Sequence, residues 1–284
     1  MPKEALLSTL MNKLNQHVAS AYSTWPQPQN NDKLLLWAAV LAFILGTALL
    51  LTNGLQTGFY AAQFMSLILP PLVWEHLSFM GDTLVILTLA LLFAYRYPHL
   101  LFALLITAIV GTLITHGIKP WLATPRPPGV LDPGSFQLIG SSISKKSMPS
   151  GHTLTAFAAA GLLTRLATNK AMQLLILIAA CFIGWSRVAV GVHWPADVFM
   201  GAAGGLISAW VGLKLCDRWY RFFGGRFYLI MLLIHTGCAF ALINYDGGFP
   251  HTWLFAVIAS AISLGTIYHQ FTRHKLIPTF TRKE

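Results

Sequence analysis

Long runs of apolar residues separated by short polar loops constrain the fold of this chain more than any other feature. A helix needs about 20 apolar residues to cross the hydrocarbon core of a bilayer. Of the 284 residues, 55% are hydrophobic and only 10% are charged, whereas soluble domains carry about 25% charged residues. The sequence therefore predicts an all-α fold, a polytopic transmembrane helical bundle.

Eight runs are candidate spans. They are residues 34–52, 83–95, 100–118, 152–167, 172–190, 198–216, 227–244 and 253–271. The second and fourth are short, so we expect their helices to extend into flanking residues. The segment 53–82 is apolar but interrupted by glycines and by Pro70-Pro71. It indicates one or two interfacial helices, with Tyr60 and Trp74 near the lipid headgroups.

The segment before the first run is mostly polar. Four of its apolar residues recur at helical spacing, namely Leu7, Met11, Leu14 and Val18. An amphipathic helix on the membrane surface and a frayed tail are both open interpretations. Residues 25–33, rich in proline and asparagine, indicate a linker.

We expect three parts in the chain. Residues 1–33 form a cytoplasmic N-terminal segment, residues 34–226 form a membrane core, and residues 227–284 form two additional spans followed by a basic cytoplasmic tail. The positive-inside rule supports this orientation. With a cytoplasmic N-terminus and eight crossings, fourteen Lys and Arg residues lie inside and five lie outside.

The formal net charge of +10 could indicate a nucleic-acid partner. The charges cluster in short loops between the apolar runs, a pattern typical of membrane topology, so we expect the lipid bilayer and no nucleic acid as the partner.

Three of the five outside cations lie at or just beyond the ends of apolar runs. Lys119, Arg126 and Arg187 share one face in this topology, and residues 83–216 contain only two acids, Asp132 and Asp197. Cations near a bilayer are costly unless they pair with a counter-charge. Guanidinium groups match phosphate oxygens bidentately, so the pattern favours an anionic ligand. Snorkelling of the cations toward headgroups is the alternative.

The tetrapeptide Pro149-Ser150-Gly151-His152 opens the run 152–167. Ser150 is a good N-cap, and Gly151 lets the backbone approach a ligand closely. The free N–H groups at a helix N-terminus form an anion site. An ordinary helix start is the alternative interpretation.

A histidine and a carboxylate are spaced to pair at the start of the run 198–216. Pro195 suits the first position of a helix, and Asp197 then lies four residues after His193. Asp197 can accept a hydrogen bond from His193 Nδ1, which leaves Nε2 free as a base or nucleophile. A purely structural capping pair remains open.

Three motifs follow one another along the chain. The first is Lys119 followed after six residues by Arg126-Pro127, the second is Pro149-Ser150-Gly151-His152, and the third is Ser186-Arg187 followed by His193 and Asp197. In this order and spacing they resemble the three-part signature of the type 2 phosphatidic acid phosphatase superfamily. That family includes bacterial phosphatidylglycerophosphate and undecaprenyl-diphosphate phosphatases and lipid A 1-phosphatases. The resemblance covers residues 80–216 and implies a six-helix phosphatase core. The positive-inside rule places its site on the non-cytoplasmic face, which is the periplasm if the protein lies in a bacterial inner membrane. The last two runs are additional to that core.

The resemblance also implies the role of each residue. His193 would attack phosphorus and form a phosphohistidine, Asp197 would orient it, and His152 would protonate the leaving oxygen and then activate water. The phosphate would be held by Lys119, Arg126, Ser150, Gly151 and Arg187.

The implied reaction is hydrolysis of a phosphomonoester or diphosphate of a membrane lipid. Undecaprenyl diphosphate, phosphatidylglycerophosphate and phosphatidic acid are the expected substrates. A lipid phosphotransferase or a lipid A 1-phosphatase would use the same site. Anion binding without chemistry is a third interpretation, although it would need only the cations. The sequence offers no carboxylate cluster for Mg²⁺, so we expect no metal and no cofactor. The oligomeric state is open.

Two further residues are weaker candidates for the site. Asp82 precedes the run 83–95, and His116 lies one turn before Lys119. The sequence Asp246-Gly247-Gly248 indicates a turn between the last two runs.

Overall fold

The computed structural model describes residues 3–26, 31–274 and 276, and in these ranges its regular elements are all helical. The α-helices are α1 (Lys3–Ala21), α2 (Asn31–Asn53), α3 (Phe59–Met65), α4 (Pro71–Met80), α5 (Thr83–Ala94), α6 (Pro98–Leu122), α7 (Gly151–Leu166), α8 (Lys170–Ala189), α9 (Pro195–Trp219), α10 (Gly225–Leu242) and α11 (Trp253–Arg273). The predicted polytopic helical bundle is confirmed. From residue 277 on, the basic tail lies outside the described residues.

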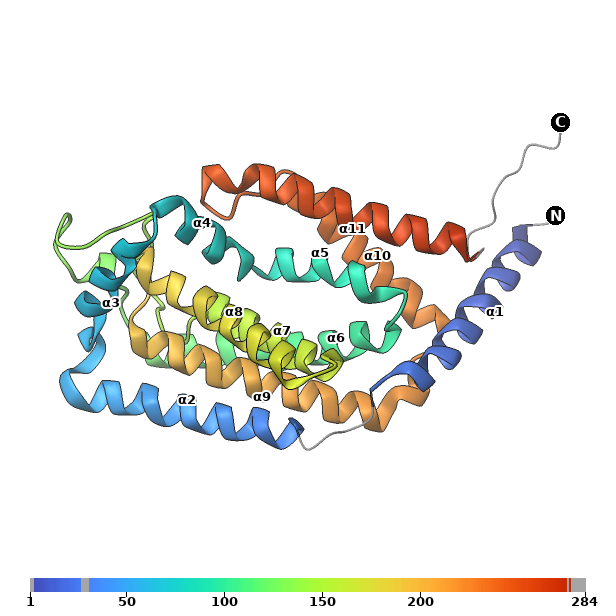
Figure 1. Ribbon diagram of the computed structural model, residues 1–284, viewed down its shortest axis with the longest axis horizontal. Coiled ribbons are helices and arrows are strands. Elements are labelled where there is room, and N and C mark those ends of the chain that lie inside the picture. The colour runs from blue at the N-terminus through green and yellow to red at the C-terminus, as the bar shows by residue number, and fades with distance from the viewer. Residues whose placement is uncertain (1–2, 27–30, 275, 277–284) are drawn as a thin grey trace.

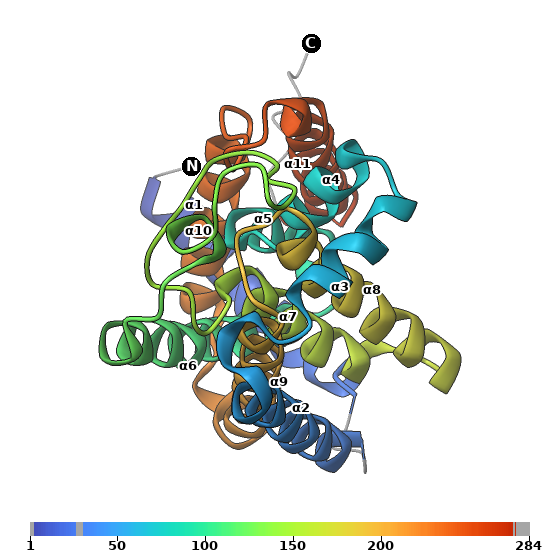
Figure 2. The ribbon, with the colours of Figure 1, turned by 90° about the vertical axis from the view of Figure 1, so that its left-hand side faces the viewer.

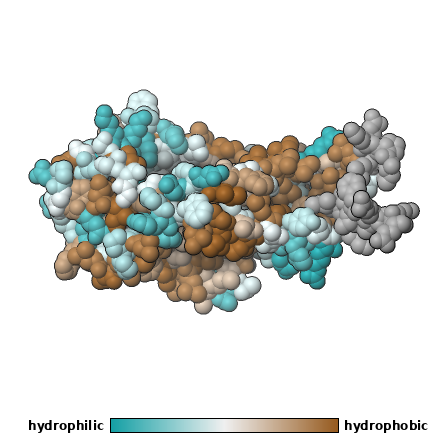
Figure 3. All heavy atoms as spheres, turned by 90° about the horizontal axis from the view of Figure 1, so that it is seen from above, coloured by the Kyte–Doolittle hydropathy of each residue, from teal (hydrophilic) through white to brown (hydrophobic). Residues whose placement is uncertain are grey.

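The long helices run back and forth along the long axis of the molecule (Figure 1). One end carries α3, α4, the connection between α6 and α7, and the connection between α10 and α11; we call it the motif end. The other end carries α1 and the last turns of α11. Figure 3 shows hydrophobic residues over the middle of the visible face and hydrophilic ones toward both ends. This distribution fits a bundle that crosses a membrane along its long axis.

Six helical segments are long and apolar enough to cross a membrane on their own, within the described residues. They are Asp32–Gln56, Pro98–Gly129, Lys170–Ala189, Pro195–Phe222, Gly225–Leu242 and Pro250–Arg273. The helices α4 and α5 form a further broken span, bent by 65°. We expected the helices of the second and fourth apolar runs to extend into flanking residues. This expectation is wrong, because α5 ends at Ala94 and α7 has only 16 residues. The α4 helix precedes α5 across the bend, and the two together form the broken span. The short α7 helix packs between α6, α8 and α9.

The segment 53–82 contains two short helices, α3 and α4, as the sequence indicated. Pro71 occupies the first turn of α4. The Trp74 side chain does not face lipid directly, since it is only 1% exposed and packs in a core cluster with Phe79 and Val190. Its indole N–H donates to the Ser66 carbonyl at 2.8 Å. Tyr60 is exposed.

The N-terminal segment is a helix packed on the bundle and not a frayed tail. Leu14 and Val18 of α1 are buried. The Asn15 side chain accepts a hydrogen bond from the Gly225 N–H at 2.7 Å, and His17 Nε2 donates to the Tyr95 carbonyl at 3.0 Å. Of the predicted linker, residues 27–30 lie outside the described part of the chain. Its flanks are ordered into the fold, because Trp25 and Asp32 are both buried.

Glycines let α9 contact its neighbours through the backbone. A Cβ atom at Gly201 would lie 2.6 Å from the Ser150 carbonyl oxygen, and one at Gly205 would lie 2.3 Å from that of Leu154. Small residues allow such close approach between membrane helices. The first turn of α7 is therefore held against the second and third turns of α9 by main-chain contact.

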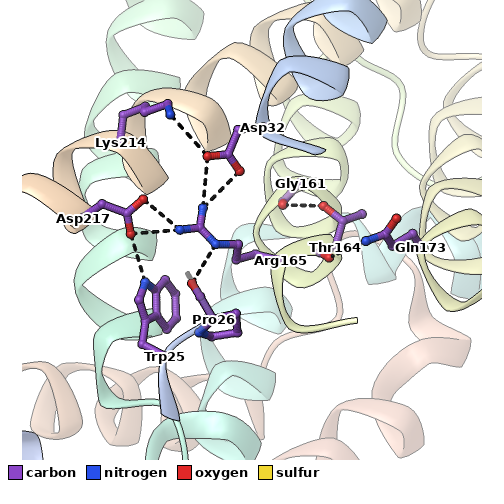
Figure 4. Close-up of polar contacts among 9 residues, drawn as sticks. All are labelled: Trp25, Pro26, Asp32, Gly161, Thr164, Arg165, Gln173, Lys214 and Asp217. Atoms are coloured by element: carbon purple, nitrogen blue, oxygen red, sulfur yellow. Dashed lines mark hydrogen bonds and ion pairs between the residues drawn. The ribbon is translucent and has the colours of Figure 1, made fainter. Parts of the chain in front are cut away.

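A buried arginine ties α7 to three other segments at the end opposite the motif end (Figure 4). One terminal nitrogen of Arg165 donates to both carboxylate oxygens of Asp32, at 3.0 and 3.2 Å, and the other donates to both oxygens of Asp217, at 3.0 and 2.8 Å. Its Nε donates to the Pro26 carbonyl at 2.9 Å. The Trp25 indole donates to Asp217 at 3.1 Å, and Lys214 lies 3.4 Å from Asp32. Two carboxylates therefore neutralise a guanidinium that is almost fully out of water.

Candidate active site

The motif residues come together at the motif end because successive long helices are antiparallel. Figure 2 looks onto this end, where the connection between α6 and α7 arches over the helix termini. The residues lie at the end of α6 (Lys119), just after it (Arg126), at the start of α7 (Ser150, Gly151, His152), at the end of α8 (Arg187) and at the start of α9 (His193, Asp197). All eight predicted site residues therefore share one end of the bundle.

The His193–Asp197 pair has the expected contact. His193 Nδ1 lies 3.1 Å from Asp197 Oδ2, and both side chains are buried. The same oxygen accepts the Trp194 N–H at 2.9 Å, which caps α9. Asp197 therefore both caps α9 and holds the imidazole of His193. The contact with His193 and the capping role, which the sequence left as alternatives, are both present.

Ser147 is a site residue that the sequence did not indicate. Its hydroxyl donates to Asp197 Oδ2 and lies 3.4 Å from His193 Nδ1. The loop carrying Ser147 is anchored by its own N–H, which donates to the Thr124 carbonyl at 2.9 Å. Because a serine in a loop has no local pattern that would mark it, only the tertiary contact identifies it.

The surroundings of His193 keep its imidazole neutral. Burial, followed by the positive charges of Arg126, Arg187 and Lys119, holds the pKa of His193 well below its usual value of 6.5. A neutral imidazole with Nδ1 directed to Asp197 has its Nε2 lone pair available.

The two arginines are positioned by neutral groups. Arg126 donates from Nε to the Lys145 carbonyl at 2.9 Å and from a terminal nitrogen to the Val192 carbonyl at 3.2 Å. Arg187 donates to the Ser78 hydroxyl, and its buried Nε has no hydrogen-bond partner in the described chain. A cationic site whose donors are not neutralised by the protein suits an anionic ligand.

The start of α7 forms the opposite wall. Ser150 caps α7, as predicted, by accepting from the Thr153 N–H at 3.5 Å and from the Thr153 hydroxyl at 2.9 Å. Its own N–H donates to the Asp197 carbonyl at 3.0 Å, which joins the first turns of α7 and α9. The His152 side chain keeps 28% of its surface exposed and lies on the wall of a cavity.

That cavity has a volume of about 230 Å³ and lies between α5, α6 and α7. Asp82, His116 and His152 form part of its polar lining, and aliphatic side chains form the remainder. The structure therefore brings both weaker candidates, Asp82 and His116, to the same cavity as His152. A second cavity of about 170 Å³ shares Ile86, Leu104 and Ala159 with the first and has an apolar lining.

Residues 96–221 match the model of the PAP2 superfamily. The chain therefore carries a PAP2 superfamily domain, the family that its three motifs predicted.

Two relatives are phosphatases by name. The chain is 34% identical over 125 residues to an undecaprenyl-diphosphatase of Sulfolobus acidocaldarius, covering 44% of this chain and 57% of the relative. It is 27% identical over 149 residues to a lipid A 1-phosphatase of Rhizobium etli, covering 51% of this chain and 54% of the relative. The matches thus span little more than half the length of these relatives.

A solved structure shares the fold. It is the first transmembrane PAP2 type phosphatidylglycerolphosphate phosphatase from Bacillus subtilis, with a TM-score of 0.50 and 21% identity. The similarity covers 64% of this chain and 96% of that one. The chain is therefore an integral membrane protein with the helical fold of membrane PAP2 phosphatases.

Proposed function

We propose that this protein hydrolyses a phosphomonoester or diphosphate of a membrane lipid through a phosphohistidine intermediate. The observation that carries the proposal is the buried His193–Asp197 pair, whose neutral imidazole is surrounded by three cations. Binding of an anion alone would not require that pair. The names of the relatives supply the reaction class.

The reaction proceeds in two displacements at phosphorus. In the first, His193 Nε2 forms a bond to phosphorus while the bond to the lipid oxygen breaks. The leaving oxygen takes the electron pair of that bond and a proton from His152. In the second, water attacks phosphorus, His152 accepts a proton from it, and the P–N bond breaks to release orthophosphate and neutral His193. Asp197 stabilises the positive charge that develops on the His193 ring.

The cations hold the equatorial oxygens during both steps. Phosphoryl transfer depends mostly on positioning and charge stabilisation. The guanidinium groups of Arg126 and Arg187 and the ammonium of Lys119 supply fixed positive charge, and the Gly151 N–H and Ser150 complete the set at the helix N-terminus.

The substrate is a lipid because the site adjoins apolar cavities between membrane helices. The cavity beside His152 shares wall residues with the apolar cavity along α5. Undecaprenyl diphosphate, phosphatidylglycerophosphate, phosphatidic acid and lipid A 1-phosphate all combine a phosphate with apolar chains. A phosphotransferase would differ only in its acceptor.

The positive-inside rule supports a bacterial inner-membrane location with the motif end on the periplasmic side. The division into a cytoplasmic N-terminal segment (residues 1–33), a core (residues 34–226) and two added spans with a basic tail (residues 227–284) is likewise our proposal. In the structure the two added helices pack on α5.

We expect phosphate release by the purified protein to survive EDTA. Within the described ranges no three His, Cys, Asp or Glu side chains are grouped to hold a metal ion, and fixed cations can supply the charge that Mg²⁺ often supplies. The measurement offers the four lipids separately, in detergent, with and without EDTA, to the wild type and to His193→Ala.

Release from one lipid in EDTA names the substrate. Loss of activity on chelation, restored by Mg²⁺, would overturn metal independence. Transfer of label to a second lipid without release would move the assignment to a phosphotransferase. No release and no transfer would overturn the proposed function.

The pKa of His193 leads to a second expectation. Because the folded pKa lies below 6.5, the imidazole stays unprotonated as the pH falls from 7.5 to 6.5, and kcat/KM should show no decline from protonation of His193 over this interval after correction for ionisation of the substrate. The kcat/KM value reports ionisation of the free enzyme. A decline with a midpoint near 6.5 would show that the nucleophile titrates like an ordinary histidine.

A further inference from the structure

A carboxylate outside the three motifs faces His152. Asp82 Oδ2 lies 3.7 Å from His152 Nε2, and the Asp82 side chain is only 13% exposed. Its other oxygen, Oδ1, accepts the Leu84 N–H at 2.8 Å and so caps α5. The cap fixes the carboxylate with one oxygen on the helix and the other directed toward the imidazole.

The approach of Asp82 to His152 depends on the break between α4 and α5. A Cβ atom at Gly81 would lie 3.1 Å from both the Cβ and the carbonyl oxygen of His152, and 2.8 Å from the Ile183 side chain. A larger residue would push the break away from α7. Gly81 therefore lets the start of α5 meet the first turn of α7.

A tyrosine from the connection between α10 and α11 holds the same carboxylate oxygen. The Tyr245 hydroxyl donates to Asp82 Oδ2 at 3.0 Å. Burial, followed by the negative charge of Asp82, raises the pKa of Tyr245 to about 12, so the phenol keeps its proton and remains a donor. Residues 82 and 245 are far apart in the sequence, and Tyr245 belongs to the connection between the two helices that follow the motifs.

The connection is built to place Tyr245 there. Gly247 has a φ of 63°, and a Cβ atom at this position would lie 2.8 Å from the Phe79 ring. The Asp246 side chain accepts the Gly248 N–H at 2.9 Å and closes the turn. His251 Nδ1 lies 2.8 Å from Glu75 Oε2, a second link between the connection and α4. The Asp246-Gly247-Gly248 turn is thus docked on α4.

The charges around His152 explain why a carboxylate is needed. The ring must carry two protons when the leaving oxygen departs, yet the nearby cations oppose a positive imidazolium. The titratable groups around it are Lys119, Arg126, Arg187, His193, His116, Tyr245 and Asp82. In the described chain Asp82 is the one carboxylate within 4 Å of a His152 nitrogen. An opposite charge at this distance favours the protonated ring.

We propose that Asp82, held in place by the Tyr245 hydroxyl, is the positioning residue that keeps His152 oriented and protonated for departure of the lipid oxygen. The inference rests on the proposed function, because it assigns a partner to its general acid. Tyr245 acts through Asp82 and does not touch the substrate. The α10–α11 hairpin is then a part of the catalytic machinery.

The kinetic test compares Asp82→Asn, Tyr245→Phe and the double variant. Asparagine also caps helices well, so Asp82→Asn removes the charge and keeps α5. We expect kcat to fall about 10- to 100-fold, within the range of general acid–base catalysis, with little change in KM. The basic limb of the kcat profile should move about one unit or more to lower pH.

For Tyr245→Phe we expect a decrease in kcat of about threefold to tenfold, from the loss of one hydrogen bond to a charged group. The double variant should be no slower than Asp82→Asn, because residues that act through one contact are not additive. The matched controls are Asp132→Asn and Tyr60→Phe. They remove a carboxylate and a phenolic hydroxyl from exposed residues, and both variants should retain wild-type kinetics. If the basic limb of the kcat profile has the same midpoint in Asp82→Asn as in the wild type, the inference is overturned.

A second measurement does not depend on turnover. Protein labelled with ¹⁵N in histidine, reconstituted in nanodiscs, allows the His152 ring to be titrated by NMR, with its signals assigned from His152→Gln. We expect its titration midpoint to be lower in Asp82→Asn than in the wild type, and unchanged midpoints would again overturn the inference. A wild type that titrates as expected but releases no phosphate would count against the proposed function while leaving the Asp82–His152 contact supported.

Discussion

Replacement of His193 by alanine is expected to lower lipid phosphate release by at least about 10³-fold, because it removes the nucleophile and with it the covalent step. His152→Ala should cost less, about 10²- to 10⁴-fold from general acid–base catalysis alone, with the covalent route still open. The measurement is initial-rate phosphate release for both variants under the conditions of the wild type.

Trapping separates these two roles. With a labelled diphosphate substrate, whose leaving group departs with little protonation, His152→Ala should accumulate an acid-labile phosphoenzyme because hydrolysis of the intermediate is slowed. His193→Ala should give no labelled protein. Near-wild-type turnover of His193→Ala, or labelling that survives its replacement, would show that another residue is the nucleophile.

Replacement of Arg165 by methionine is expected to destabilise the protein by about 3–5 kcal/mol. The substitution keeps much of the side-chain volume but leaves the buried carboxylate of Asp32 and the half-buried one of Asp217 without their shared partner. Thermal unfolding in detergent, followed by tryptophan fluorescence or circular dichroism, measures the effect. The yield of folded protein should decrease in parallel, because this cost is a large fraction of the stability of a domain.

Arg218→Met is the matched control for Arg165→Met. Arg218 is an exposed arginine on α9, so its replacement should change stability by no more than about 0.5 kcal/mol. Adding Asp32→Asn and Asp217→Asn to Arg165→Met should restore part of the loss, since the uncompensated charges are then gone. An Arg165→Met protein as stable as the wild type would mean that water reaches this network freely.

The helical bundle and the common end of the motif residues were predictable from the sequence. Apolar runs near 20 residues set the crossings, and alternating crossings bring every second helix end to the same face. The motif residues lie at those ends. The four-residue spacing of His193 and Asp197 predicted the contact between their side chains. These features depend on local pattern, which a single sequence contains.

The remaining features depend on tertiary contacts. In the sequence Arg165 looks like any other cytoplasmic arginine, and only the fold shows that Asp32 and Asp217 contact it. Trp74 is of the residue type that is common at membrane interfaces, but the packing of α4 buries its side chain. Ser147 and Tyr245 reach the site from loops that no periodicity marks.

The length of α7 is a further tertiary effect. A helix that faces lipid must match the bilayer in length. Because α7 packs between α6, α8 and α9, its 16 residues are sufficient inside the bundle.

The backbone contact between α7 and α9 has a consequence for how the protein responds to its lipid surroundings. Bilayers differ in thickness, and membrane helices adjust to them by tilting. Where Gly201 and Gly205 bring main-chain atoms together, no deformable side chain lies between α7 and α9 to take up such a movement. The outer helices can tilt while His152 and His193, at the starts of these two segments, keep their spacing. The spacing between these two histidines is then set by the α7–α9 contact and not by the thickness of the membrane.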